Sequence, residues 1–141
     1  MRLQTCIKPQ NFYDVYCWYI SAKLKKIDLF LKTSWRGIGA ETTARLLGIS
    51  SGEVRDIMKD EGIQRIDRTN FYQIMRRGSS DICRYIYREA QLDYPVTYTM
   101  EDIAYIYDLN INDVIRASEA TGIYEATALT LPCLFYHIPV E

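Results

Sequence analysis

The residues whose chemistry stands out first are four arginines in a short stretch, Arg65, Arg68, Arg76 and Arg77. A guanidinium group presents a planar fork of N–H donors that matches the oxygens of a phosphate group. The alternative is an ordinary solvated surface, because arginine is mostly exposed in folded proteins. We interpret the cluster as a set of candidate phosphate-binding residues.

Catalytic and metal-binding chemistry has little support in the sequence. His137 is the only histidine, and its nearest partner for activating a nucleophile is Cys133. The four cysteines are far apart and form no C-x-x-C pair, which favours free buried thiols over zinc ligands. The fragment Gly37-Ile38-Gly39 is too short for a phosphate loop. We therefore expect a structural His137, no enzymatic activity, and no metal or cofactor.

Residues 40–59, AETTARLLGISSGEVRDIMK, predict two helices joined by a tight turn. Ala44 is small, as helices that cross closely require, and Gly48 can adopt the positive φ of the turn. Val54 and Ile57 then fall on the inner face of the second helix. This pattern is typical of a helix-turn-helix, although short helical hairpins also occur in proteins that never contact DNA.

The neighbouring elements follow from apolar spacing and from capping residues. We expect, in chain order, a short strand at residues 2–7, a helix from about Asp14 to Lys32, a helix end at Gly62, a two-stranded wing over residues 63–75 with Phe71–Met75 as a strand, and a helix over residues 81–91 capped by Ser80. No run of about 18 apolar residues and no apolar signal core is present, which predicts no membrane span and a cytoplasmic location.

The helix-turn-helix pattern returns 60 residues later. The matched positions include Glu41 and Glu101, Ala44 and Ala104, Val54 and Val114, and Gly62 and Gly122, although Asp108 stands where Gly48 should be. Asn-Phe-Tyr also recurs, at residues 11–13 and 70–72. A fixed period indicates two copies of one unit, and convergence between similar helix pairs is the alternative. We expect a mostly α fold of two tandem helix-turn-helix units with short β wings, over residues 1–78 and 79–141, the second wing spanning residues 123–138.

Charge is distributed unevenly along the chain, although the net charge is −1. Residues 1–39 carry +5 (seven Lys/Arg against two Asp/Glu), residues 40–78 carry +1 (seven against six) and residues 79–141 carry −7 (three against ten). The basic part favours a polyanion, and the alternative is that the two halves attract each other. The acidic part is rich in tyrosine, which predicts packing between the units or a surface for a protein partner or a second copy. The lysines of the first predicted helix, Lys23, Lys25, Lys26 and Lys32, are interpreted as a solvated face.

Residues 42–78 resemble the winged helix-turn-helix of excisionases and mercury-resistance-type regulators. The residues that carry the resemblance are Ala44, Leu47-Gly48-Ile49-Ser50, Val54, Gly62-Ile63, Arg65 and Arg68. Residues 99–123 show it more weakly. The resemblance implies that the second helix enters the major groove of DNA and that the wing contacts flanking phosphates.

By this resemblance, the residues that would contact double-stranded DNA are Ser51, Arg55 and Lys59 on the helix and Arg65, Arg68, Arg76 and Arg77 on phosphates. Glu53 and Asp56 lie on the same outward face, where acids are unfavourable because phosphates and most base edges accept hydrogen bonds. We expect a small DNA-binding regulator that dimerises to match two half-sites. The alternative is a protein-binding inhibitor or adaptor of the mobile-element type, because a fold does not determine a function.

Overall fold

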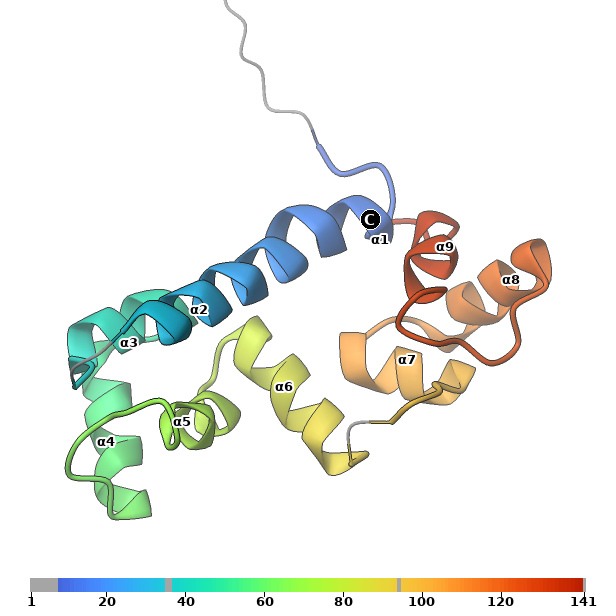
Figure 1. Cartoon of the computed structure of the whole chain (residues 1–141). Coiled ribbons are helices and arrows are strands. Elements are labelled where there is room, and N and C mark those ends of the chain that lie inside the picture. Colours follow the sequence, from blue (N-terminus) through green and yellow to red (C-terminus); the bar gives the residue numbers. More distant parts are fainter. Residues whose placement is uncertain (1–7, 35–36, 94, 141) are drawn as a thin grey trace, which may run out of the picture. The chain divides into compact units, whose positions relative to one another are not determined.

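The computed structural model describes residues 8–34, 37–93 and 95–140, and these residues are mostly helical (Figure 1). They contain no β-sheet, only isolated bridges that pair Asn11 with Pro139, Ile38 with Ile66 and Tyr98 with Ala126. No helix among them is long and apolar enough to cross a membrane. The strand expected at residues 2–7 lies outside the described residues.

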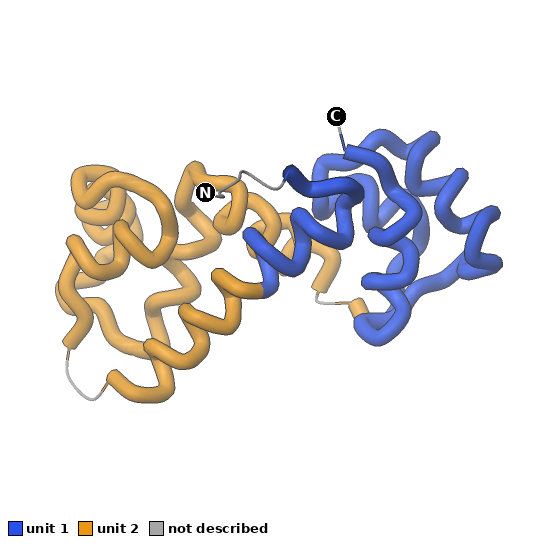
Figure 2. Tube along the Cα trace, turned by 90° about the horizontal axis from the view of Figure 1, so that it is seen from above, with its two compact units in different colours: residues 1–21, 96–141 blue, residues 22–95 orange. Residues whose placement is uncertain are grey.

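The chain forms two compact units, and the first is built from two separate stretches of sequence (Figure 2). Unit 1 comprises residues 1–21 and 96–141, and unit 2 comprises residues 22–95. This division differs from the sequence-based boundary between residues 78 and 79, because the helix over 81–91 packs on the helix before it. Unit 2 carries fourteen Lys/Arg against ten Asp/Glu, a charge of +4, and unit 1 carries three against eight, a charge of −5.

Unit 2 is assembled from α2 (Ala22–Thr33), α3 (Ala40–Leu47), α4 (Ser51–Glu61), α5 (Phe71–Arg77) and α6 (Asp81–Gln91). The predicted turn between α3 and α4 is present, since Gly48 has a φ of 72° and Ser50 Oγ accepts a hydrogen bond from the Glu53 amide at 3.0 Å. Gly62 ends α4 with a φ of 70°, and Ser80 caps α6 as predicted. These ends agree with the sequence because capping depends on residues within one turn.

Unit 1 contains α1 (Phe12–Val15), the π-helical segment η1 (Tyr16–Ser21), α7 (Met100–Tyr107), α8 (Ile111–Thr121) and α9 (Leu131–Tyr136). Its core is aromatic, because the ring centroid of Phe135 lies 4.9 Å from that of Phe12 and 5.1 Å from that of Tyr107. The Phe12 amide also donates to the Ile138 carbonyl at 2.8 Å, so α1 is held next to α9. The helix predicted over residues 14–32 is confirmed as α1, η1 and α2 in direct succession.

The helices of the two units recur with the predicted offset of 60 residues. The helices of unit 2 begin at Ala40, Ser51 and Phe71, and their counterparts α7, α8 and α9 begin at Met100, Ile111 and Leu131. The Asn-Phe-Tyr match does not belong to this register, because Asn11 begins α1 whereas Asn70 begins α5, the counterpart of α9. The structural repeat therefore covers three helices, and the first copy lies within unit 2.

The expected wing strands are wrong, because residues 71–75 are helical. In the preceding turn, Asp67 Oδ1 accepts hydrogen bonds from the Thr69 and Asn70 amides at 2.9 and 3.0 Å. Asn70 Oδ1 accepts in return from the Asp67 amide at 2.8 Å, and this turn starts α5. The helix then buries three side chains at helical spacing: Phe71, Ile74 and Met75. The second expected wing, over residues 123–138, is wrong in the same way, because α9 occupies its last part.

Candidate nucleic-acid interface

The outward face of α4 carries the three helix residues that were predicted to face DNA. Ser51, Arg55 and Lys59 are four residues apart, so they lie along one side of the helix. Val54 and Ile57 are buried on the other side, which leaves the predicted face toward solvent. Arg55 and Lys59 are exposed, and Ser51 is half-buried. The structure therefore brings these three side chains together.

Arg55 is held by an acidic residue of the preceding helix. Its guanidinium forms an ion pair with Glu41 of α3 and approaches Ser51 Oγ at 3.4 Å. The two side chains of the ion pair are 58% and 68% exposed, and such a pair is worth only about 0.2–1 kcal/mol. A phosphate oxygen could therefore replace Glu41 at little cost. Sequence reasoning missed this pair because Glu41 lies on another helix.

Glu53, one of the two acids expected to repel DNA, is half-buried and hydrogen-bonded to another segment of unit 2. Its carboxylate accepts hydrogen bonds from the Ser79 amide at 2.7 Å and from the Ser79 hydroxyl at 2.8 Å. Ser80 Oγ, the next residue, donates to the Leu47 carbonyl at 2.6 Å. Asp56 remains an exposed acid on α4. One of the two unfavourable carboxylates is thus committed to joining α4 to the segment that leads into α6.

The loop between α4 and α5 exposes Arg65 and Arg68. Arg65 lies across Gly37, where a Cβ atom would be 2.7 Å from Arg65 Nε, so glycine makes room for the guanidinium. The pKa of Asp67 is lowered, mainly because the Thr69 hydroxyl donates to its carboxylate and, less strongly, because Arg65 is nearby. Arg68 has no ion pair with any carboxylate that the structure describes. Both guanidinium groups are therefore accessible from solvent.

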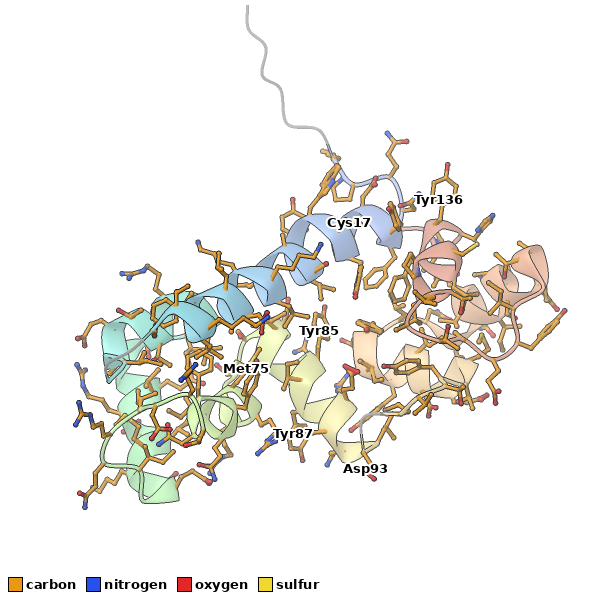
Figure 3. The ribbon with its side chains drawn as sticks, viewed as in Figure 1. Cys17, Met75, Tyr85, Tyr87, Asp93 and Tyr136 are labelled. Carbon is orange, nitrogen blue, oxygen red and sulfur yellow. The ribbon has the colours of Figure 1, made fainter. Side chains whose placement is uncertain are left out.

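Arg76 and Arg77 end α5 and have different surroundings. Arg77 forms ion pairs with Glu61 and, at 3.4 Å, with Asp60 at the C-terminal end of α4. Both arginines line a cavity of about 320 Å³ that also includes Tyr87 of α6, which is labelled in Figure 3. The predicted residues on the α4 face do not line this cavity. Arg76 and Arg77 therefore share a cavity that Ser51, Arg55 and Lys59 do not line.

The counterpart face on α8 of unit 1 lacks the basic row. Arg116 forms an ion pair with Asp113 at 2.7 Å. Glu119 stands at the position of Lys59, 60 residues later. An acidic helix face would repel a polyanion, so the candidate interface is confined to unit 2.

His137 and Cys133 make a backbone contact rather than a nucleophile pair. His137 Nδ1 lies 3.1 Å from the Cys133 carbonyl oxygen, and both side chains are exposed. The expectation of buried thiols holds for Cys83, whose pKa is raised by burial, and it is wrong for Cys133. Within the described parts of the chain, no group of three or more His, Cys, Asp or Glu residues could hold a metal ion.

Comparison with other proteins assigns neither a family nor a function to the chain. No protein-family model, no curated protein sequence and no solved structure matches the chain. Its function is therefore inferred from its own residues.

Proposed function

We propose that unit 2 binds double-stranded DNA, with α4 as the helix that enters the major groove. The observation that supports this most directly is the exposed row of Ser51, Arg55 and Lys59, continued by Arg65 and Arg68 in the next loop. Hydroxyl, guanidinium and ammonium groups donate hydrogen bonds, whereas phosphates and most base edges accept them. The charge of +4 on unit 2 favours the same polyanion.

The size of α4 suits this role. It has eleven residues, which at about 1.5 Å per residue gives a length of about 16 Å, and an α-helix with its side chains is about 10–12 Å in diameter. The major groove is about 12 Å wide and admits an α-helix. In this arrangement Arg55 exchanges Glu41 for a DNA acceptor, and Arg65 and Arg68 contact the flanking backbone. A regulatory role and a dimer matched to two half-sites belong to the same proposal.

Titration with random-sequence duplex DNA at several salt concentrations tests the proposal. Each phosphate contact lowers the logarithm of the binding constant by about 0.9 per decade of salt. We expect Arg65→Ala/Arg68→Ala to reduce this slope by about 2. Lys32→Ala, at an exposed lysine paired with Asp28, is the matched control and should leave the slope unchanged. Absence of binding even at low salt would refute the proposal, and equal slopes for both variants would remove the loop from the interface.

A protein-binding module is the second candidate, and exposed tyrosines on unit 1 favour it. Tyr124 and Tyr136 are 67% and 59% exposed, and the ring centroids of Tyr13 and Tyr136 lie 6.3 Å apart. Figure 3 shows Tyr136 at the end of α9, pointing away from the helices. Tyrosine is enriched among the residues that dominate protein interfaces. In an acidic unit, such a surface suits a basic partner or the basic unit 2 of another copy.

Sedimentation velocity over a concentration series tests whether the partner is a second copy of the chain. We expect Tyr124→Ser/Tyr136→Ser to weaken association, whereas Tyr72→Ser on unit 2 should not. A chain that stays monomeric at every concentration would exclude the second copy as the partner.

A further inference from the structure

A cavity between α2 and α3 gathers positive charge without a counterion. It has a volume of about 240 Å³ and lies within unit 2. Its lining includes Lys23, Lys26, Ile27 and Phe30 from α2, and Arg45 and Leu46 from α3. No described carboxylate is part of the lining. The wall is therefore both cationic and apolar.

The cavity follows from the spacing of residues on the two helices. Lys23, Lys26 and Phe30 stand at positions i, i+3 and i+7 of α2, which places them on one side. Ile27 and Leu46 are buried and give the cavity an apolar floor. The lysines interpreted from the sequence as a solvated face thus divide into two groups, because Lys23 and Lys26 face α3.

Several basic side chains elsewhere in unit 2 have carboxylate partners. Examples are Lys32 with Asp28, Arg55 with Glu41 and Arg84 with Asp81. By contrast, Lys23, Lys26 and Arg45 form no ion pair with any carboxylate in the described part of the chain. Like charges that converge beside an apolar wall repel each other, and a bound anion relieves that repulsion.

Lys23 differs from Lys26 and Arg45 because it also lies near the C-terminal end of α3. Its Nζ lies 3.5 Å from where a Cβ atom of Gly48 would be, at the C-terminal end of α3. The helix dipole favours a cation at that end. Lys26 and Arg45 are therefore the sharper reporters of a bound anion.

We propose that this cavity binds a small organic anion with an apolar or aromatic body. Lys26 and Arg45 hold the carboxylate or phosphate head by charge-assisted hydrogen bonds, and Ile27, Phe30 and Leu46 contact the body. The volume lies just below the usual range for ligand sites, about 300–1,000 Å³. An aryl phosphate or aryl carboxylate therefore suits it better than a polymer. This binding is separate from the α4 face and goes beyond the proposed DNA binding.

An NMR titration of the ¹⁵N-labelled chain tests the proposal with four probes: phenyl phosphate, benzoate, inorganic phosphate and phenol. We expect at least one of the two aromatic anions to bind with 1:1 stoichiometry and to shift amides of α2 and α3. Inorganic phosphate should bind at least about tenfold more weakly, because it lacks the apolar body, a difference of about 1.4 kcal/mol. Phenol, which lacks the charge, should not bind.

Variants of the lining assign the site. Lys26→Gln and Arg45→Gln should each weaken binding of the aromatic anion at least about fivefold, because each removes one of the charges that hold the head. Lys25→Gln and Lys32→Gln, at exposed lysines of the same helix outside the lining, are the matched controls and should not change it. Circular dichroism of every variant checks that the helices are intact, and Lys26→Arg should preserve binding.

Three outcomes would overturn the proposal. The first is that neither aromatic anion binds, and the second is that the lining variants and the controls weaken binding equally. The third is that random duplex DNA shifts the α2 and α3 amides while the aromatic anions do not, which would assign these cations to backbone phosphates. Arg65→Ala/Arg68→Ala should leave anion binding unchanged, so failure of the DNA proposal is distinguishable from failure of this one.

Discussion

The α3–α4 pair of unit 2 and the α7–α8 pair of unit 1 share one backbone pattern but belong to units of opposite charge. Both pairs turn at a residue with positive φ, Gly48 at 72° and Asp108 at 57°, and both second helices have eleven residues and end at a glycine. The unit charges are nevertheless +4 and −5. Buried residues and turns thus maintain the fold, while the outward faces are free to take different roles.

The two helix pairs also differ in the contacts of one acidic residue that both of them carry at the same position. Glu53 and Asp113 hold matching positions, and Glu53 accepts hydrogen bonds from the Ser79 amide and hydroxyl. The residue of unit 1 that matches Ser79 is Pro139, which has no amide hydrogen. Asp113 pairs instead with Arg116, and a cavity of about 680 Å³ lined by both Asp113 and Pro139 lies there. Pro139 therefore cannot give Asp113 the amide hydrogen bond that Ser79 gives Glu53.

The largest expected effect tests whether α5 and α9 anchor their units equally. Phe71 and Phe135 are fully buried, so Phe71→Ala and Phe135→Ala should each lower the free energy of unfolding by about 3–5 kcal/mol. Urea denaturation followed by circular dichroism measures both. Tyr72→Ala, at an exposed position next to Phe71, should cost less than about 1 kcal/mol. Loss of stability in only one of the two phenylalanine variants would break the equivalence of the helices.

The next effect comes from exchanging the turn residues. A Cβ atom at Gly48 would meet no atom closer than 3.5 Å, but its φ of 72° disfavours any side chain. Gly48→Ala should therefore cost about 1–2 kcal/mol. Asp108→Gly should stabilise unit 1 by up to about 1 kcal/mol, because glycine adopts a φ of 57° readily. Denaturation midpoints that move in the same direction in both variants would contradict this explanation.

A smaller effect is expected from the matched acids. Glu53→Ala should lower the free energy of unfolding by about 1 kcal/mol, because the Ser79 donors lose a charged acceptor. Asp113→Ala should cost less than about 0.5 kcal/mol, because its partner Arg116 is 69% exposed. A double-mutant cycle of Glu53→Ala with Ser79→Ala isolates the hydroxyl contact. Zero coupling in that cycle would show that the contact adds nothing to stability.

The last effect is a gain of stability at a buried hydroxyl group. Thr43 is fully buried, and its hydroxyl has no hydrogen-bond partner among the described residues. The matching residue of unit 1 is Ile103, which is also fully buried and carries no polar atom in its side chain. Thr43→Val should therefore raise the free energy of unfolding by about 0.5–1 kcal/mol. Thr42→Val, at the half-buried neighbour, is the control, and a destabilised Thr43→Val would reveal a hidden partner for the hydroxyl.

Local signals were sufficient to predict the helix ends and the α4 face. Gly48, Gly62 and Ser80 act within one turn of their helices, and the row from Ser51 to Lys59 follows from helical periodicity alone. The prediction of the wing was wrong because Asp67 and Asn70 are residue types that occur both in hairpin turns and directly before helices. Burial of the side chains that follow them decides between the two, and burial depends on the rest of the unit.

Contacts between helices could not be predicted from one sequence. The partners Arg55 and Glu41 are 14 residues apart, and Glu53 and Ser79 are 26 residues apart. These contacts determine which charges of the candidate site are already occupied. The structural division differs from the predicted boundary for the same reason, since packing of α6 on α5, rather than any linker composition, places residues 81–91 in unit 2.

The hydrogen bond between Phe12 and Ile138 has a consequence for the order of folding. It joins residues 126 positions apart (138 − 12), whereas the bridge between Ile38 and Ile66 in unit 2 spans 28 (66 − 38). For a flexible chain, closing the longer loop costs about 1.3 kcal/mol more. During synthesis the contiguous unit 2 is complete well before α9 is made, so it can fold first. Once folded, unit 2 shortens the loop that remains to be closed. The aromatic core of unit 1 can form only after α9 has been synthesised, although α1 is synthesised early.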